Sequence, residues 1–343
     1  MSGLPAGRPT MPAAALTTRP PRVRVLNRKH DSAAVVYQLT AGRHRQLGVI
    51  VELAIDDYRS GRIRRHEATH PDPVRRLAEM WETSALAHMP VTLFHRSMPR
   101  LRALLCQTAT GEPDGRLVSG EGGSEAAWLL PDGAVARAIQ AELAELDVLY
   151  IADGHHRMSA AADYFAGHAG VAPFMPAALF PADEMRVLGY HRCLARPAPE
   201  SETLETLAAL PATAWLTESA VPVEPAPGIV GVHLDGRWYR LGLRTPPAAA
   251  DPRASLDLVA LENGILSPML GGADVASDVR ITAVPGTEDT ASLARYCAER
   301  DTIGFLLYPP DIRQIMAVAD AGLVMPPKST WFDPKPSSGL LHG

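Results

Sequence analysis

The sequence has few cysteines, no long apolar run and no excess of basic residues. Its three cysteines, Cys106, Cys193 and Cys297, are widely scattered and match neither a disulfide framework nor the spacing of a zinc site. We therefore expect buried, reduced thiols. No apolar run approaches the roughly 20 residues that span a bilayer, so the sequence predicts no transmembrane segment and no membrane partner.

Charge and composition exclude a second group of functions. The net charge is -5 and the isoelectric point is about 6.2, so the surface as a whole is not that of a nucleic-acid-binding protein. The hydrophobic fraction of 46% and the mean hydropathy of -0.03 are those of a globular protein with an ample core. The start of the chain has no charged-then-apolar signal pattern, which predicts a cytoplasmic protein. The sequence does not determine the oligomeric state, and a homodimer remains one of the alternatives.

Composition divides the chain into three parts. Residues 1–21 are rich in proline and small residues and predict a disordered tail. Residues 22–196 alternate β-rich apolar segments with helical ones and predict an α/β core. An Ala-, Pro- and Glu-rich stretch then marks a boundary, and residues 197–343 predict a second α/β region whose C-terminal segment packs back on the core. The alternation of strands and helices predicts an α+β, or mixed α/β, fold class.

Three further stretches give expectations for the fold. Residues 108–125 are Gly-rich and acidic and predict an exposed loop. Residues 229–243 predict a hairpin that turns at Asp235-Gly236. Residues 256–270 predict a single helix with its leucines facing inward.

The most informative stretch is Leu149–Ala162. An apolar segment, residues 148–151, has the length and composition of a short buried strand. It ends at the turn pair Asp153-Gly154, and the residues from Met158 onward have helical propensity and period. A strand, a glycine turn and a helix leave free backbone N–H groups at the helix N-terminus, where an anion binds well.

The same turn carries three side chains that can donate hydrogen bonds to phosphate oxygens, His155, His156 and Arg157. The sequence therefore predicts a phosphate-binding turn. The alternative is structural, with Asp153 capping the helix while the histidines satisfy polar groups of the core. The strand–turn–helix setting favours the phosphate interpretation.

A second candidate site lies at His66 and Glu67, on a turn just before a predicted helix. Thr69 is the expected N-cap, with a proline in the first turn and Asp72 at the third helical position, and the helix is expected to run to about Ala87. On this turn Glu67 is either a general base placed beside arginines or an ordinary surface carboxylate, the usual fate of a glutamate.

The C-terminal stretch from Met325 to Lys335 is not a low-complexity tail. Two aromatic residues and a Lys-Ser-Thr run between prolines predict an ordered, extended segment that lies over the domain. Lys328 and Lys335 are either phosphate contacts or plain solvated lysines. The chain has very few lysines, and most of its cations are arginines.

These motifs resemble a bacterial and archaeal family known as the domain of unknown function number 1015. The resemblance covers most of residues 35–341 and departs from the family at the N-terminus, which looks shorter than usual. It rests on several long motifs in the right order: Gly48-Val49 with Asp57-Tyr58, His66-Glu67-x-Thr69, Tyr150 through Arg157, Leu256-Asp257 through Leu270-Gly271, and Asp320-Ala321-Gly322 through Lys335. The family name implies no activity.

A more distant resemblance does imply an activity. The strand–Asp-Gly-His-His-Arg–helix element is similar to the phosphate-binding element of the ParB/sulfiredoxin-like fold, a group that includes free serine kinases and ParB-type nucleotide switches. This resemblance implies a ParB/sulfiredoxin-like nucleotide-binding core. It also implies contacts to nucleotide phosphates from Asp153, Gly154, His155, His156 and Arg157.

The roles that this resemblance implies agree with the chemistry of phosphoryl transfer, which needs mainly positioning and charge neutralisation. With ATP or ADP bound, Arg157 is expected to grip two phosphate oxygens while a protonated histidine stabilises the equatorial charge. Asp153 is expected to hold a magnesium ion. Glu67, carried over by position alone, is expected to accept the proton of an acceptor hydroxyl, and His66 to orient phosphate or Glu67. The C-terminal segment adds three candidate nucleotide contacts, Lys328, Ser329 and Thr330.

Two hypotheses for the function follow. The first is a nucleotide-dependent small-molecule kinase that phosphorylates the hydroxyl of a free amino acid such as serine. The alternative is a nucleotide-binding regulatory switch that transfers nothing to a small molecule, and only the kinase makes a phosphorylated product in step with nucleotide loss. A metal-dependent hydrolase built on His155, His156 and Asp153 ranks last, because adjacent histidines at a turn point in different directions and the H-E-x-x-H spacing is absent.

Overall fold

The computed structural model describes residues 23–25, 32–81, 89–118, 123–166, 173–244 and 251–337. The predicted tail, residues 1–21, lies outside these ranges, as does the predicted end of the helix near residue 87. Among the helices that the structure describes, none is long and apolar enough to cross a membrane. The architecture is a mixed α/β fold with two large sheets, as the sequence predicts, while the ParB/sulfiredoxin-like assignment stays a prediction.

Nine of the described strands form the first sheet, in the order β4-β8-β5-β9-β3-β2-β7-β6 with β1 paired to β3. The pairs β4–β8 and β5–β9 are parallel, and the remaining pairs are antiparallel. The β2–β3 pair is antiparallel because a tight turn joins these two strands, and strands joined by a hairpin must run in opposite directions. The strands are β1 (Val23–Val25), β2 (Ser32–Ala41), β3 (His44–Ala54), β4 (Ile63–Arg64), β5 (Val91–His95), β6 (Gly115–Val118), β7 (Gly123–Pro131), β8 (Leu149–Asp153) and β9 (Phe174–Pro181).

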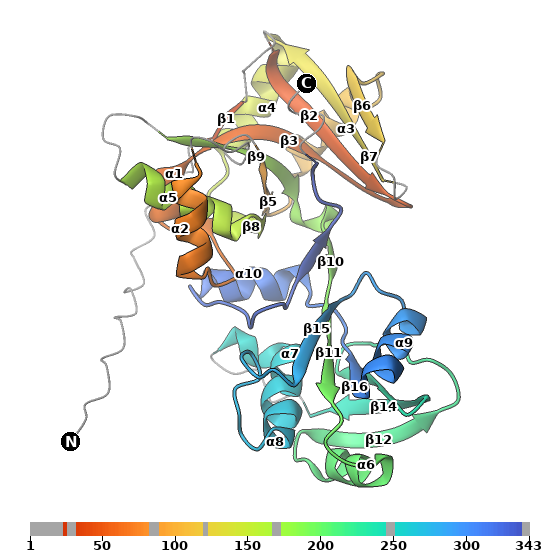
Figure 1. Cartoon of the computed structure of the whole chain (residues 1–343). Coiled ribbons are helices and arrows are strands. Elements are labelled where there is room, and N and C mark those ends of the chain that lie inside the picture. Colours follow the sequence, from red (N-terminus) through yellow and green to blue (C-terminus); the bar gives the residue numbers. More distant parts are fainter. Residues whose placement is uncertain are drawn as a thin grey trace, which may run out of the picture.

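Helices cover one face of this sheet. Alternate residues along β2 separate the two faces: Val36 belongs to the core under the helices, whereas Val35 and Tyr37 belong to a smaller cluster on the other side. Figure 1 shows α1, α2 and α5 grouped at one end of the sheet. The helices that pack here are α1 (Ile55–Arg59), α2 (Pro71–Glu79), α3 (Pro99–Thr108), α4 (Ala134–Ala144) and α5 (His155–Ala166).

The second sheet is antiparallel throughout, in the order β12-β14-β13-β16-β11-β15. The predicted hairpin turns at Asp235 and Gly236, both with positive φ, as a two-residue turn between strands requires. The strand of residues 190–195 lies in this sheet, although the predicted boundary at residue 196 assigned it to the first region. The elements are β11 (Tyr190–Ala195), α6 (Glu200–Ala209), β12 (Thr213–Ser219), β13 (Ile229–Leu234), β14 (Arg237–Leu243), α7 (Asp257–Leu261), α8 (Ser267–Met269), β15 (Ile281–Pro285), α9 (Thr290–Arg300) and β16 (Thr302–Leu306).

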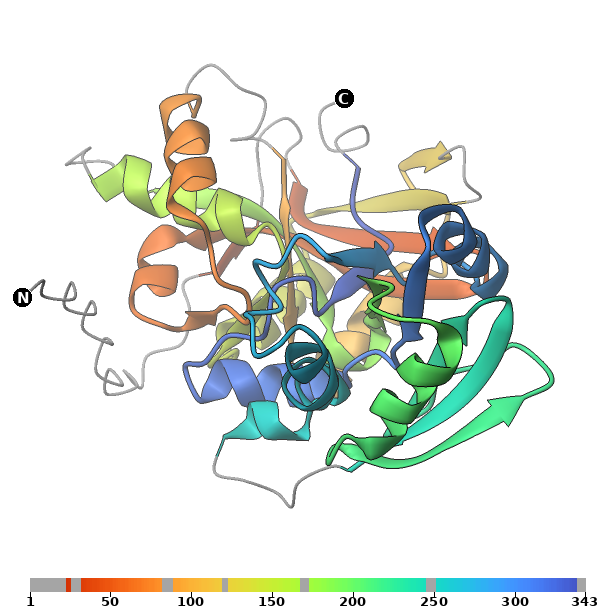
Figure 2. The same cartoon turned by 60° about the horizontal axis from the view of Figure 1, so that its bottom comes forward.

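Three elements connect the two sheets, β10 (Arg186–Leu188), α10 (Ile312–Asp320) and β17 (Trp331–Asp333). Strand β17 pairs antiparallel with β10, and both lie between the two sheets in Figures 1 and 2. An apolar cluster joins these elements to the first sheet, since the rings of its strands β5 and β8 pack with side chains of α10 and of the chain beyond it. The buried members of this cluster include Phe94, Tyr150, Ile315, Met325 and Phe332.

The helix predicted to begin at Thr69 begins one residue later. His70 is the N-cap of α2 and makes no side-chain capping bond, so the predicted Thr69 cap is wrong. Pro71 and Pro73 in the first turn of α2 explain the shift. Proline fits the first turn of a helix, and because it has no N–H group it leaves no donor there for a capping side chain to satisfy.

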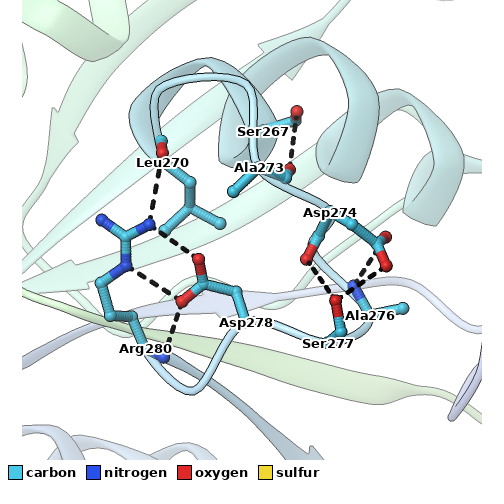
Figure 3. A network of polar contacts seen from close by, with 8 residues as sticks. All are labelled: Ser267, Leu270, Ala273, Asp274, Ala276, Ser277, Asp278 and Arg280. Carbon is cyan, nitrogen blue, oxygen red and sulfur yellow. Dashed lines mark hydrogen bonds and ion pairs between the residues drawn. The ribbon is translucent and has the colours of Figure 1, made fainter. Parts of the chain in front are cut away.

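Two other predictions are corrected by the structure. The stretch at residues 108–125 is only partly a loop, because β6 and the start of β7 pair within it. The predicted helix at residues 256–270 is interrupted by a π-helical turn at Glu262–Leu266 between α7 and α8. The chain that follows is fixed by its own polar side chains: Asp274 accepts hydrogen bonds from Ser277, and Arg280 binds Asp278 and the Leu270 carbonyl, as Figure 3 shows.

Candidate functional site

A polar pocket of about 280 Å³ lies where the edge of the first sheet meets the C-terminal segment, residues 325–335. One wall comes from the turn between β8 and α5 together with Glu67. The other wall comes from the C-terminal segment and from the first residue of β11. The lining residues are Glu67, Ala152, Asp153, Gly154, His155, His156, Arg157, Tyr190, Lys328, Thr330, Phe332 and Lys335.

Gly154 forms the turn between β8 and α5. Its φ is +98°, a conformation that glycine adopts without steric cost. A Cβ at this position would lie 2.6 Å from a methyl carbon of Val91, so the close approach of β5 also requires glycine. Helix α5 closes its first turn with a hydrogen bond from the Met158 N–H to the Gly154 carbonyl. The N–H groups of residues 155–157 precede that bond, which leaves the helix N-terminus able to bind an anion.

Two lysines stand on the opposite wall. The chain has only three lysines, and Lys328 and Lys335 both line this pocket. The Lys335 ammonium lies 2.7 Å from Asp153 Oδ1 and 4.5 Å from the centre of the Trp331 ring. The Lys328 ammonium lies over the Tyr190 ring at 5.5 Å, and no carboxylate in the described ranges forms an ion pair with it. Lys328 is therefore the cation most available to a bound anion.

Glu67 faces these cations across the pocket. Partial burial raises the pKa of its carboxyl group above the usual range, while His156, Lys328 and Lys335 counteract this and Asp153 adds to it. Its Oε2 lies 4.0 Å from His155 Nδ1. A partly buried carboxylate with a raised pKa, next to cations, has the properties of a general base.

The histidines at this site differ in burial. His155 and His66 are 5% and 1% exposed, and their rings meet edge to face with centres 4.6 Å apart. Burial lowers the pKa of His155 well below its usual value and that of His66 to about 4, so both rings are neutral near pH 7. The prediction of a protonated histidine on the phosphate therefore does not suit His155. His156 accepts a hydrogen bond from the His70 N–H at its Nε2, 3.2 Å away.

His66 lies behind the pocket wall rather than in it. Its Nε2 is 3.1 Å from the Thr330 hydroxyl, and its carbonyl accepts a hydrogen bond from the Met325 N–H at 2.8 Å. His66 thus holds the C-terminal segment against the turn that carries Glu67. We place it as a positioning residue for the C-terminal segment, whereas the sequence predicts that it orients phosphate or Glu67.

Two predicted phosphate contacts are used in other ways. The Arg157 Nη1 donates to the carbonyls of Met89 and Pro90, and its Nη2 donates to Asp153 at 3.0 Å. The predicted bidentate grip of Arg157 on phosphate would require these bonds to break, so the guanidinium fastens the turn instead. The Ser329 hydroxyl donates to the Pro326 carbonyl, and the side chain lines a neighbouring pocket rather than this one.

A magnesium ion on Asp153 does not fit the donors present. Both oxygens of this carboxylate already accept from cations, Oδ1 from Lys335 and Oδ2 from Arg157. Magnesium needs several oxygen ligands in octahedral geometry. Across the parts of the chain that the structure describes, no group of three or more His, Cys, Asp or Glu side chains could hold a metal ion. We therefore derive no step through a protein-bound metal.

Sequence reasoning missed the residue that supports the second wall. Arg192 is 2% exposed and forms a buried ion pair with Glu262, at 2.9 Å between Nη2 and Oε1. The same guanidinium donates to the carbonyls of Pro327 and Lys328 at 3.0 Å each. Glu262 lies at the start of the π-helical turn, a kind of irregularity that often occurs at functional sites. An arginine inside an apolar strand was the only signal for this role in the sequence.

The sequence matches the family described as "Protein of unknown function (DUF1015)" over residues 13–259. The chain belongs to this family. The matched range contains the Glu67 turn and the turn at Asp153–Arg157, and it ends before the C-terminal segment that supplies the lysines. No curated protein matches the sequence.

Solved structures of low similarity align with most of the chain. A free serine kinase variant in complex with AMP is 13% identical, with 89% of this chain and 91% of that chain covered and a TM-score of 0.41. SbnI from Staphylococcus aureus, truncated at its C-terminus, is 12% identical, with 83% and 82% covered and a TM-score of 0.41. A conserved hypothetical protein from Pyrococcus furiosus is 12% identical, with 85% and 93% covered and a TM-score of 0.37. Similarity at this level does not decide an activity.

Proposed function

We propose that this protein is a nucleotide-dependent small-molecule kinase that transfers a phosphoryl group from ATP or ADP to the hydroxyl of a free amino acid such as serine. The observation that carries the proposal is the convergence of three features on one pocket. Two of the chain's three lysines and the N-terminus of α5 line the same pocket as the carboxylate of Glu67, whose pKa is raised. The resemblance of the Asp153–Arg157 motif to the phosphate-binding element of free serine kinases agrees with this arrangement.

The anion-binding half of the pocket would hold the nucleotide phosphates. The N–H groups of residues 155–157 point the positive end of the helix dipole at the bound anion. Lys328 supplies a mobile point charge, since its ammonium has no carboxylate partner in the described ranges. Lys335 supplies a second charge from its position on Asp153. Such preorganised charges stabilise the phosphoryl group during transfer, which is the main demand of this chemistry.

Glu67 would accept the proton of the attacking hydroxyl. The new bond forms between the acceptor oxygen and the transferred phosphorus, the bond to the nucleotide's leaving oxygen breaks, and the hydroxyl proton moves to Glu67. Its raised pKa brings the carboxylate closer to the basicity that proton transfer at neutral pH favours. The neutral ring of His155, 4.0 Å away, borders the base without competing for the charge.

The test is phosphorus NMR of the purified protein with ATP or ADP, supplied with magnesium as the nucleotide's counter-ion, and a pool of hydroxyl amino acids. We expect a new phosphomonoester signal that grows as nucleotide is lost. Nucleotide binding without a new ester, or with free phosphate alone, would overturn the kinase proposal in favour of a regulatory switch.

The variant Glu67→Gln isolates the role of the base. Removing a general base lowers the rate by about 10²–10⁴-fold, so we expect transfer to fall by at least about a hundredfold while nucleotide affinity is retained. Glu112→Gln is the matched control, because this carboxylate is almost fully exposed and far from the pocket lining. Normal turnover by Glu67→Gln would show that another group takes the proton.

A further inference from the structure

Two cysteines that are far apart in the sequence meet beneath helix α9. Cys193 lies on β11 and Cys297 on α9, and their sulfur atoms are 3.9 Å apart. Both side chains are buried, at 0% and 2% exposure. Cys106 is exposed elsewhere on the surface, so the expectation of a buried thiol is wrong for this residue. The two thiols are therefore in van der Waals contact, and their proximity is a feature of the second sheet alone.

The sheet provides a place for the Cys297 sulfur. Gly304 of β16 pairs with Cys193 on one side and with His233 on the other, so these three residues form a row across three strands. A Cβ at position 304 would lie 2.7 Å from the Cys297 sulfur, so any larger residue would push the sulfur away. Paired residues on neighbouring strands present the same face, which places Cys193 and His233 on the side that α9 covers.

Cys297 is the member of the pair that a small reactant can approach. It forms part of the wall of a pocket of about 330 Å³, together with His233 from the same row. The pocket is polar, since Arg196 lines it and forms ion pairs with Asp235 and Asp301. Cys193 is fully buried and is absent from the lining of this pocket.

We propose that Cys297 and Cys193 form a peroxide-reactive dithiol site, with Cys297 as the nucleophile and Cys193 as the resolving thiol. This inference does not depend on the proposed kinase activity, because the pocket at Cys297 and the pocket at Glu67 share no lining residue. The small polar pocket suits hydrogen peroxide or a short alkyl hydroperoxide.

The reaction has two balanced steps. The Cys297 thiolate attacks one peroxide oxygen, so that an S–O bond forms, the O–O bond breaks, and the leaving oxygen takes a proton from water. Cys193 then attacks the sulfenic sulfur of Cys297, so that the S–S bond forms and the S–O bond breaks with loss of water. A disulfide is about 2.05 Å long, so the two sulfurs must approach by about 2 Å.

The electrostatics of the pair agree with this division of roles. The hydrogen bond with Cys193 lowers the pKa of Cys297, burial opposes this effect, and the His233 ring lowers the pKa further. The pKa of Cys193 is raised by the same hydrogen bond and by burial. The thiolate is the reactive form, so attack begins at Cys297. Among the described residues, no group of three or more His, Cys, Asp or Glu side chains, this cluster included, could hold a metal ion.

The experiment oxidises the folded, full-length protein with hydrogen peroxide and follows free thiols with time. After alkylation and proteolysis without reductant, mass spectrometry should find a peptide pair joined through Cys193 and Cys297, two hydrogen atoms lighter than the separate peptides. Free-thiol labelling should be lost at these two cysteines while Cys106, an ordinary exposed thiol, still labels. Oxidation of Cys106 ahead of the pair, or a pair that stays reduced until the protein unfolds, would overturn the proposal.

Two variants assign the roles. In Cys193→Ser we expect Cys297 to stop at the sulfenic acid, which dimedone traps as a covalent adduct. In Cys297→Ser we expect Cys193 to remain a free thiol, and a dimedone adduct on Cys193 there would contradict the assignment. Cys106→Ser is the control and should leave the cross-link unchanged. The order of oxidation in the unmodified protein tests the proposal even if a variant does not fold.

Discussion

The two walls of the Glu67 pocket are held in place by different forces. The wall at Asp153–Arg157 is set by backbone geometry and by the core of the first sheet, since Gly154 packs against Val91 and buried residues of α5 lie in that core. The wall formed by the C-terminal segment is anchored near its ends by Met325 and Phe332 in an apolar cluster. Between these two anchors it is held by polar contacts to Arg192 and His66. Apolar packing fixes a position through many small contacts, whereas the stretch of the second wall between Met325 and Phe332 depends on a few strong ones. We expect the second wall to be far more sensitive to single substitutions.

Among the variants considered, Arg192→Ala, which acts on the second wall, should cause the largest loss of unfolding free energy. This change leaves the buried Glu262 carboxylate without its cation and frees two carbonyls of the C-terminal segment. Breaking a buried ion pair in this way costs about 3–5 kcal/mol, which urea denaturation measures as a loss of unfolding free energy. Arg75→Ala removes an ion pair that is exposed on both sides, and should leave the unfolding free energy unchanged. Equal losses in both variants would refute the view that Arg192 fastens this wall.

The next effect is on the first wall, from Gly154→Ala. Gly154 and Gly61 both have positive φ, so Gly61→Ala is the matched control. A Cβ at Gly154 would meet Val91, whereas a Cβ at Gly61 would lie in open space. Both substitutions strain the backbone, and overpacking should cost Gly154→Ala about 1–3 kcal/mol more. Thermal unfolding of the two variants gives this difference. Identical stability losses would show that β5 moves away freely and that the turn is not fixed by packing.

A smaller effect separates the two lysines. Lys328 has no ion-pair partner within the described chain, whereas Lys335 is already paired with Asp153. A cation that is free before binding gives its full interaction to phosphate, so we expect Lys328→Ala to weaken ADP binding about tenfold, or about 1.4 kcal/mol, and Lys335→Ala to weaken it less. Isothermal titration calorimetry measures both affinities. A larger loss for Lys335→Ala would reverse the roles of the two lysines.

The smallest effect is a displacement of the pH profile. Glu67 must be deprotonated to accept a proton, so kcat should fall as the pH drops through its pKa, at a pH above that of an ordinary glutamate. Lys328 lowers this pKa, and its removal in Lys328→Met should move the acid limb of kcat to higher pH. Lys335→Met should move the limb in the same direction by less, because its effect on Glu67 is weaker. The profiles are measured at saturating nucleotide, and an acid limb that does not move would exclude Glu67 as the titrating group.

Much of the local structure could be predicted from the sequence. The hairpin at Asp235-Gly236 and the strand–turn–helix at Gly154 follow from periodicity and turn residues, which act over a few neighbouring positions. The end of α10 is of the same local kind, because Gly322 just past it has a φ of +68°, a conformation in which glycine commonly ends helices. The predicted roles in catalysis and nucleotide binding stay predictions.

Only the tertiary structure decided the partners of the charged and sulfur-bearing groups. The sequence predicts Arg157 as a phosphate ligand, but two of its hydrogen bonds go to the carbonyls of Met89 and Pro90 once β5 lies beside β8. The contact of Cys193 with Cys297 likewise arises where α9 crosses the second sheet. Secondary structure depends on the pattern of neighbouring residues, whereas these contacts join residues that are distant in the chain. Their formation depends on how the sheets and helices pack, and that is not encoded at any single stretch of sequence.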